Sequence, residues 1–152
     1  MRISIRYLPD HSINNAPHAS AFTRNYALHM HYPLDMGRLN EAAALFIGTH
    51  DFNGFKAAGS KAASTERTIF TSEWTREGDM LRYHVAGSGF LYNMVRIMVG
   101  TMIRIGQGFE EPDMIKAALA EPMRANAGDT APAHGLMLWR VKYDLFDTED
   151  LV

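Results

Sequence analysis

Alternating apolar and polar positions predict a β-hairpin in the middle of the chain. The two alternating runs are Arg67–Arg76 and Met80–Ala86, and Glu77-Gly78-Asp79 between them is typical of a tight turn. Because successive side chains of a strand point to opposite faces, each run has one apolar face. The residues expected on these faces are Phe70 and Trp74 in the first strand and Leu81, Tyr83 and Val85 in the second.

Apolar residues recur at helical spacing in three other segments. After Pro33, Asp35 is placed to cap a helix that ends near Gly48. The apolar positions of this helix are Leu39, Ala42, Ala43, Phe46 and Ile47. Phe90–Ile105 predicts a second helix, which is apolar around most of its circumference and therefore buried. A third helix is expected from Pro112-Asp113 to about Ala120.

The remaining segments complete the predicted architecture. We expect strands at Arg2–Leu8 and Asn25–Tyr32 with a polar loop, Pro9–Ser20, between them, a short helix or turn at Asp51–Ala58, and a last strand at Leu136–Tyr143. Helices mixed with strands around a hairpin predict an α+β fold, a mainly antiparallel sheet with helices packed on one side. Residues 1–152 are expected to form a single domain, with crossing strands and a loop in 1–33, the core in 34–144 and a tail in 145–152.

Composition narrows the classes of function. The 152 residues are 47% hydrophobic, which suffices for one core, and the formal net charge of −2 gives no overall basic footprint for nucleic acid. There is no cysteine, so disulfides, thiolate nucleophiles and cysteine metal sites are excluded, and a cytoplasmic location fits. The longest apolar stretch contains arginines and is too short to cross a membrane, so no membrane partner is expected.

Arg96 is the first candidate for chemistry. A guanidinium in the middle of a nearly apolar helix costs several kcal/mol if it is unpaired, so a carboxylate or phosphate partner is expected. Asn93, Gly100 and Arg104 lie close to the same stripe of the helix. The alternative is architectural, with Arg96 reaching the helix edge or pairing with a local carboxylate.

Other polar residues give weaker indications. His29 and His31 are two positions apart and could share one face of a strand, but no third ligand has a metal-site spacing, so no metal is expected. Asp51 and Asp129 are conceivable general bases or nucleophiles. Helix capping for Asp51 and a turn for Asp129 are the roles that we favour.

Four blocks of the sequence carry a resemblance to a known family. In the family's order and spacing, they resemble the C-terminal half of the tRNA pseudouridine synthase A family. The blocks are GTHDFNGFKAAGS at Gly48–Ser60, STERTI at Ser64–Ile69, GSGFLYNMVRIMVGTMIRIGQG at Gly87–Gly108 and AGDTAPAHGLMLWRVKYD at Ala127–Asp144. The resemblance implies the C-terminal subdomain of a pseudouridine synthase-like fold.

The family converts uridine to pseudouridine in the tRNA anticodon stem-loop, without metal or cofactor. Its nucleophile is an aspartate in an R-T-D-x-G-V-H-type motif of the first half, and no such motif occurs here. By resemblance, Arg96 pairs with that aspartate, while Phe90, Leu91 and Leu136 line the uridine pocket. Tyr7 lies near the place of the family's active-site tyrosine, but the surrounding pattern departs from the family's, so the role is not assigned to it.

The resemblance also implies partners, namely tRNA, a second copy in a homodimer and the missing N-terminal half. This chain alone is therefore expected to be an inactive fragment of an isomerase. Two alternatives stay open. One is a non-catalytic RNA-binding or dimerisation remnant of such a synthase, and the other is an ordinary α+β domain in which Arg96 is architectural.

Overall fold

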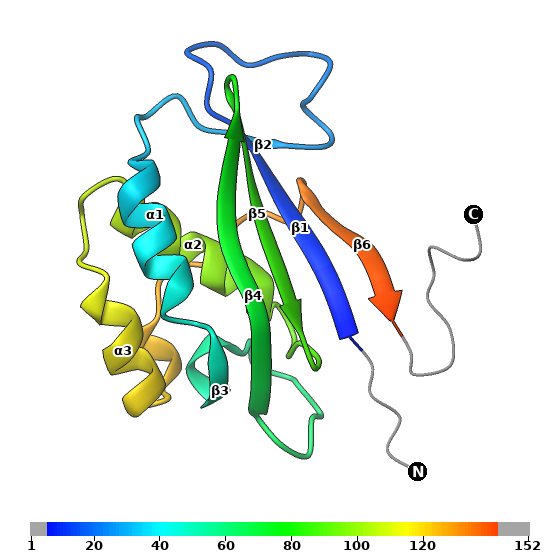
Figure 1. The fold of residues 1–152 in the computed structure, drawn as a ribbon, viewed down its shortest axis with the longest axis vertical. Helices are drawn as coiled ribbons and strands as arrows, with labels where there is room; N and C mark the ends of the chain where they lie inside the picture. Colours follow the sequence, from blue (N-terminus) through cyan, green and yellow to red (C-terminus); the bar gives the residue numbers. More distant parts are fainter. Residues whose placement is uncertain (1–5, 143–152) are drawn as a thin grey trace.

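The fold is an α+β arrangement of one sheet and three α-helices (Figure 1). The computed structural model describes the backbone of residues 6–142 and the side chains of residues 11–137. The elements are β1 (Arg6–Asn14), β2 (Leu28–His29), α1 (Met36–Ala44), β3 (Gly48–Asp51), the 3-10 helix η1 (Asn53–Phe55), β4 (Glu66–Glu77), β5 (Met80–Gly87), α2 (Met94–Gly106), α3 (Asp113–Ala120), the 3-10 helix η2 (Arg124–Asn126) and β6 (Leu136–Lys142).

The sheet has the order β2-β1-β5-β4-β3, and β6 pairs with β1. Only the short β1–β2 pair is parallel, so the predicted mainly antiparallel sheet is confirmed. All three α-helices lie on one side of the sheet (Figure 1), as predicted. None of the helices within residues 6–142 has the length and apolar character needed to span a membrane.

The central hairpin is β4 and β5, and its turn is the predicted one. Gly78 has a φ of 59°, a left-handed conformation that glycine adopts without steric cost. The predicted inner face of the first strand is partly wrong, because a register shift between Ile69 and Thr71 inserts one extra residue. Phe70 is that residue, and it is 41% exposed, whereas Ile69 and Trp74 are buried.

The segment around α1 follows the prediction at its start and departs from it at its end. Asp35 caps the helix by accepting a hydrogen bond of 3.0 Å from the backbone N–H of Arg38. Gly48 was expected to end the helix, but α1 ends at Ala44 and Gly48 begins β3, a strand that the sequence did not predict. The short helix expected at Asp51–Ala58 is η1.

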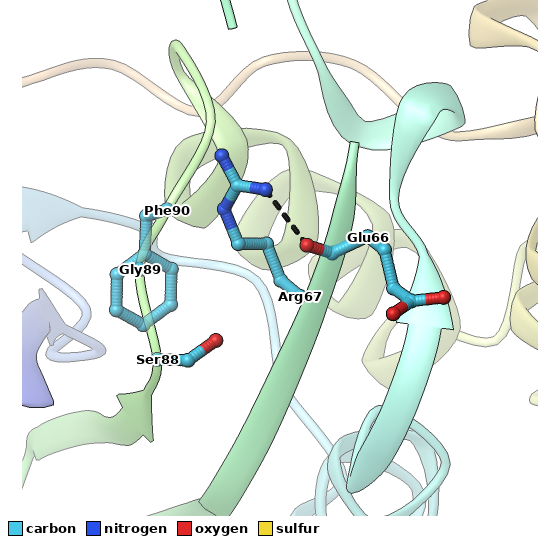
Figure 2. A pocket seen from close by; sticks show the side chains of 5 residues that line it. All are labelled: Glu66, Arg67, Ser88, Gly89 and Phe90. Atoms are coloured by element: carbon cyan, nitrogen blue, oxygen red, sulfur yellow. Dashed lines mark hydrogen bonds between the residues drawn. The ribbon is translucent and has the colours of Figure 1, made fainter. Parts of the chain in front are cut away.

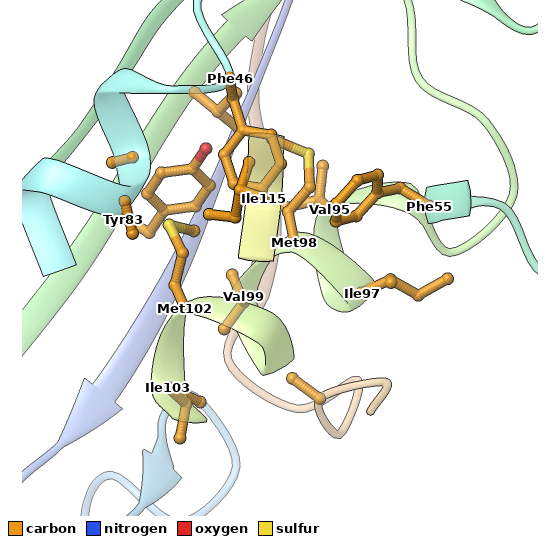
Figure 3. Close-up of a cluster of buried hydrophobic side chains, with 14 of the residues drawn as sticks. Phe46, Phe55, Tyr83, Val95, Ile97, Met98, Val99, Met102, Ile103 and Ile115 are labelled. Carbon is orange, nitrogen blue, oxygen red and sulfur yellow. The ribbon is translucent and has the colours of Figure 1, made fainter. Parts of the chain in front are cut away.

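The buried helix α2 begins at Met94, four residues later than predicted. Asn93, directly before it, has a φ of 58°, which excludes it from a right-handed helix. From Met94 onward the helix is buried on most sides, as expected. Its side chains gather with Phe46, Phe55 and Tyr83 in the main core between the sheet and the helices (Figure 3).

The prediction for the first 33 residues has the correct order of strand, loop and strand, but its bounds are wrong. The described part of the strand expected at Arg2–Leu8 belongs to β1, which continues into the predicted loop as far as Asn14 and lies between β5 and β6, while residues 2–5 lie outside the described residues. Of the second expected strand, only Leu28–His29 forms a strand. The third helix and the last strand are confirmed as α3 and β6. The predicted tail, 145–152, lies outside the described residues.

Candidate functional site

Residues 128–132, here called the crossing segment, pass directly over α2. A β-carbon at Gly100 would overlap the carbonyl oxygen of Asp129 and lie 2.8 Å from its carbon. The N–H of Gly128 donates to Thr101 Oγ1 at 2.9 Å, and the N–H of Ala131 donates to the Arg96 carbonyl oxygen at 2.9 Å. Gly100 therefore permits a backbone-to-backbone contact that fixes the crossing segment beside Arg96.

Arg96 is partly buried on α2, and the neighbours that it bonds are uncharged. Its Nε donates to the Ala131 carbonyl oxygen at 2.7 Å, and its Nη1 donates to Asn93 Oδ1 at 3.1 Å. No described carboxylate forms an ion pair with it. Two of its five N–H donors are thus used, and its positive charge is left without a counter-ion in the part of the chain that the structure describes.

His11 is a buried histidine next to Arg96 that sequence reasoning did not single out. Its Nε2 lies 3.2 Å from the carbonyl oxygen of Pro132, which only accepts, so Nε2 carries the proton. Burial is the main cause that lowers the pKa of His11. The charges of His134 and Arg96 lower this pKa further, whereas the hydrogen bond to Pro132 raises it. Its Nδ1 is buried and finds no donor within the described residues. His11 is therefore neutral.

We expect this neutral histidine to make the chain acid-sensitive. Because the pKa is lowered on folding from its ordinary value of 6.5, the unfolded chain binds more protons below that pH. Stability contributed by His11 is thus present above about pH 6.5 and is lost as the pH falls. Urea unfolding at pH 7.5 and 5.0 should show a smaller loss for His11→Gln than for the unchanged chain.

His18→Gln is the matched control, because His18 is exposed. It should keep the pH dependence of the unchanged chain. An equal loss in His11→Gln and the unchanged chain would show that the burial of His11 has no part in acid sensitivity.

Phe90 lies in an open hollow between the start of β4 and the segment that follows β5. The hollow has a volume of about 560 Å³ and is lined by Glu66, Arg67, Ser88, Gly89 and Phe90 (Figure 2). A β-carbon at Gly87 would lie 3.2 Å from Phe90 Cζ and 3.0 Å from the Thr68 carbonyl oxygen. The absence of a side chain at Gly87 therefore lets the Phe90 ring approach the strand closely.

The other two predicted pocket residues differ in their surroundings. Leu91 is 5% exposed and belongs to the hydrophobic core. Leu136 is 36% exposed and opposes His11 in the β1–β6 pairing. The crossing segment and the turn after it thus connect Leu136 and His11 to Arg96, whereas Leu91 supports the site from the core.

The weaker candidates of the sequence take structural roles. Asp51 Oδ1 accepts from the N–H of Asn53 at 3.0 Å and from Thr65 Oγ1 at 2.6 Å, which stabilises the turn into η1. Asp129 is exposed, and its backbone packs on Gly100. In the described part of the chain, no group of three histidines, cysteines, aspartates or glutamates is arranged to hold a metal ion.

Comparison with known proteins identifies the family. The family model described as tRNA pseudouridine synthase matches residues 42–144, which is more than half of the chain. The chain belongs to the tRNA pseudouridine synthase family. Enzymes of this family are isomerases. The α+β fold of this chain, with its mixed sheet, is consistent with membership of the family.

Several curated relatives are named tRNA pseudouridine synthase A. The one from Bacillus pumilus is 48% identical over 134 residues, covering 88% of this chain and 54% of the relative. Those from Bacillus subtilis and Anoxybacillus flavithermus are 47% and 44% identical, covering 84% and 82% of this chain and 51% of each relative. The chain thus spans about half the length of the curated relatives that it matches.

Proposed function

We propose that this chain supplies the arginine and the uridine pocket of a tRNA pseudouridine synthase whose nucleophilic aspartate lies outside these 152 residues. The observation that carries the proposal is Arg96, a partly buried guanidinium whose bonded neighbours are neutral oxygens. A charge in this position is stabilised by a carboxylate far more than by carbonyl groups. In the proposed enzyme, Arg96 pairs with the aspartate and orients it.

The proposed reaction isomerises a uridine in the anticodon stem-loop of tRNA. A carboxylate oxygen of the aspartate attacks C1′ of the flipped target nucleotide and bonds to it, while the bond between C1′ and N1 breaks. The base then rotates, and a new bond joins C1′ to C5 as the bond between C1′ and the aspartate oxygen breaks. The proton of C5 leaves to water and N1 gains a proton, so atoms and charge balance. No metal or cofactor enters these steps.

Around Arg96, we propose that Phe90 and Leu136 contact the target base, with Leu91 holding the segment of Phe90 from the core. Phe90 and Leu136 both present accessible apolar surface, and Leu91 is buried directly beside Phe90 in the chain. Asn93 and the crossing segment position the guanidinium. The active enzyme is proposed to be a homodimer with tRNA as its substrate.

A chimera tests the proposed function. The matching segment of the Bacillus pumilus synthase, a 48% identical relative, is replaced by this chain. Release of tritium from tRNA labelled at C5 of uridine then reports the reaction. We expect the chimera to release tritium, and this chain alone to release none.

Two other outcomes have clear meanings. Tritium release by this chain alone would show that one of its own carboxylates is the nucleophile. A folded chimera that binds tRNA but releases no tritium would favour the non-catalytic remnant. Folding of the chimera is checked by circular dichroism, so that inactivity is not confused with misfolding.

A further inference from the structure

We propose that the hollow lined by Glu66, Arg67, Ser88, Gly89 and Phe90 binds a phosphate group of the RNA strand. The phosphate would belong to a nucleotide adjacent to the target uridine, because Phe90 lines this hollow and is proposed to contact the base. The assignment to RNA rests on the proposed function. The anion site itself rests on the residues of the hollow.

Arg67 provides the positive charge. Its Nη1 donates to the carbonyl oxygens of Ser64 at 2.8 Å and Glu66 at 2.7 Å, which fixes the guanidinium in place. Its Nε and Nη2 have no acceptor, and Arg67 forms no ion pair, within the described residues. Figure 2 shows the guanidinium beside the segment of Gly89 and Phe90, while the Glu66 carboxylate points away from it.

Uncharged hydrogen-bond donors line the hollow together with Arg67. Ser88 Oγ already accepts from the N–H of Thr68 at 3.0 Å, so its own proton is available to a ligand. The backbone N–H groups of Gly89 and Phe90 follow in sequence, and neither has an acceptor in the described part of the chain. Consecutive free N–H groups next to a guanidinium are typical of anion-binding loops.

The shape of the hollow favours a phosphodiester over a small free anion. Its volume of about 560 Å³ greatly exceeds that of one phosphate, and it is open to solvent. A strand can therefore pass through it, with one phosphate at Arg67 and the neighbouring base near the Phe90 ring. Stacking on an aromatic ring accepts any base, and the phosphate contact fixes the position of the strand.

The test uses the whole chain labelled with ¹⁵N, with inorganic phosphate and a tRNA anticodon stem-loop RNA as probes. In nuclear magnetic resonance spectra, phosphate should shift the amide signals of Gly89 and Phe90 and the Nε–H signal of Arg67. RNA should shift the same signals and compete with phosphate. Arg67→Gln should abolish these phosphate shifts and weaken RNA binding about tenfold, with the slope of log affinity against log salt reduced by about one.

Arg82→Gln is the matched control, because Arg82 is an exposed arginine on the neighbouring strand and lies outside the hollow. It removes the same charge and should leave the phosphate shifts unchanged. Phosphate that fails to shift the Gly89 and Phe90 signals of the unchanged chain would overturn the anion site. Phosphate binding without competition by RNA would overturn the assignment to an RNA strand. If both probes bind as expected but the chimera is inactive, the proposed isomerase function fails while the phosphate site stands.

Discussion

Replacing Arg96 by methionine in the chimera should lower tritium release by about a thousandfold or more, without lowering the stability of this chain. The loss follows because a buried carboxylate that loses its guanidinium partner is both desolvated and misoriented, at a cost of several kcal/mol. Stability should be unchanged or raised, because the described part of the chain holds no counter-ion for Arg96 and methionine is easily buried. Activity and urea unfolding are measured on the same substitution.

Arg104→Met is the control on the same helix. Arg104 pairs with Glu110 at 3.3 Å and is 40% exposed, and such a pair contributes about 0 to 1 kcal/mol. Activity should fall less than about threefold in this variant. Arg96→Lys should be intermediate, since lysine keeps the charge but loses the planar fork. Full activity of Arg96→Met would show that Arg96 is architectural.

Replacing Gly100 by alanine should be the most destabilising of the glycine-to-alanine changes, at about 3 kcal/mol or more. The added carbon would overlap the Asp129 carbonyl oxygen, and the atoms in conflict are backbone, which no rotamer change relieves. The crossing segment has to lift from α2, so the hydrogen bond from the Ala131 N–H to the Arg96 carbonyl is lost. Urea unfolding and hydrogen exchange at Ala131 measure the two effects.

Gly37→Ala is the matched control, because Gly37 is also helical. Its added carbon would meet only the end of the Asp35 side chain, at 3.2 Å, which can move. The expected change is within about 1 kcal/mol, since alanine is the better helix former. If Gly100→Ala unfolds at the same urea concentration as the unchanged chain, the close crossing is not a constraint on the fold.

The elements predicted correctly are those whose local pattern agrees with their tertiary surroundings. The β4–β5 hairpin combines strict alternation with a glycine turn, and α1 has both a capping aspartate and a regular apolar stripe. Each signal lies within about ten residues, so no distant contact is needed to interpret it. These local signals also placed α3 and β6 correctly.

The second half of the first strand was predicted as a loop because its burial depends on distant segments. Asp10, His11, Ser12 and Asn14 give β1 a polar sequence that is typical of a loop. His11 and Asn14 are nevertheless buried, since β1 lies between β5 and β6. The spacing of His11 and Ile13, two positions apart, is consistent with one buried face of a strand. The nearby proline and asparagine residues favoured the prediction of a loop instead.

The candidate site was predicted in part. The cost of placing a charge in an apolar helix identified Arg96, and the structure gives it neutral neighbours instead of the expected carboxylate. Phe90 and Leu91 are adjacent in sequence, yet Phe90 lines a hollow and Leu91 is in the core, and both precede α2, which was predicted to begin at Phe90. Arg67 and His11 were missed because their relevance depends on contacts with segments distant in sequence.

The position of β1 has a consequence for synthesis of the chain on the ribosome. Its partner β6 follows all the other described strands in the sequence, and the bond between His11 and the crossing segment joins residues 121 positions apart. During translation, β1 can therefore pair with β5 long before its other edge is occupied. Until β6 emerges, that edge presents unpaired backbone groups to any neighbouring chain. We thus expect the emergence of β6 to control how much nascent protein escapes aggregation.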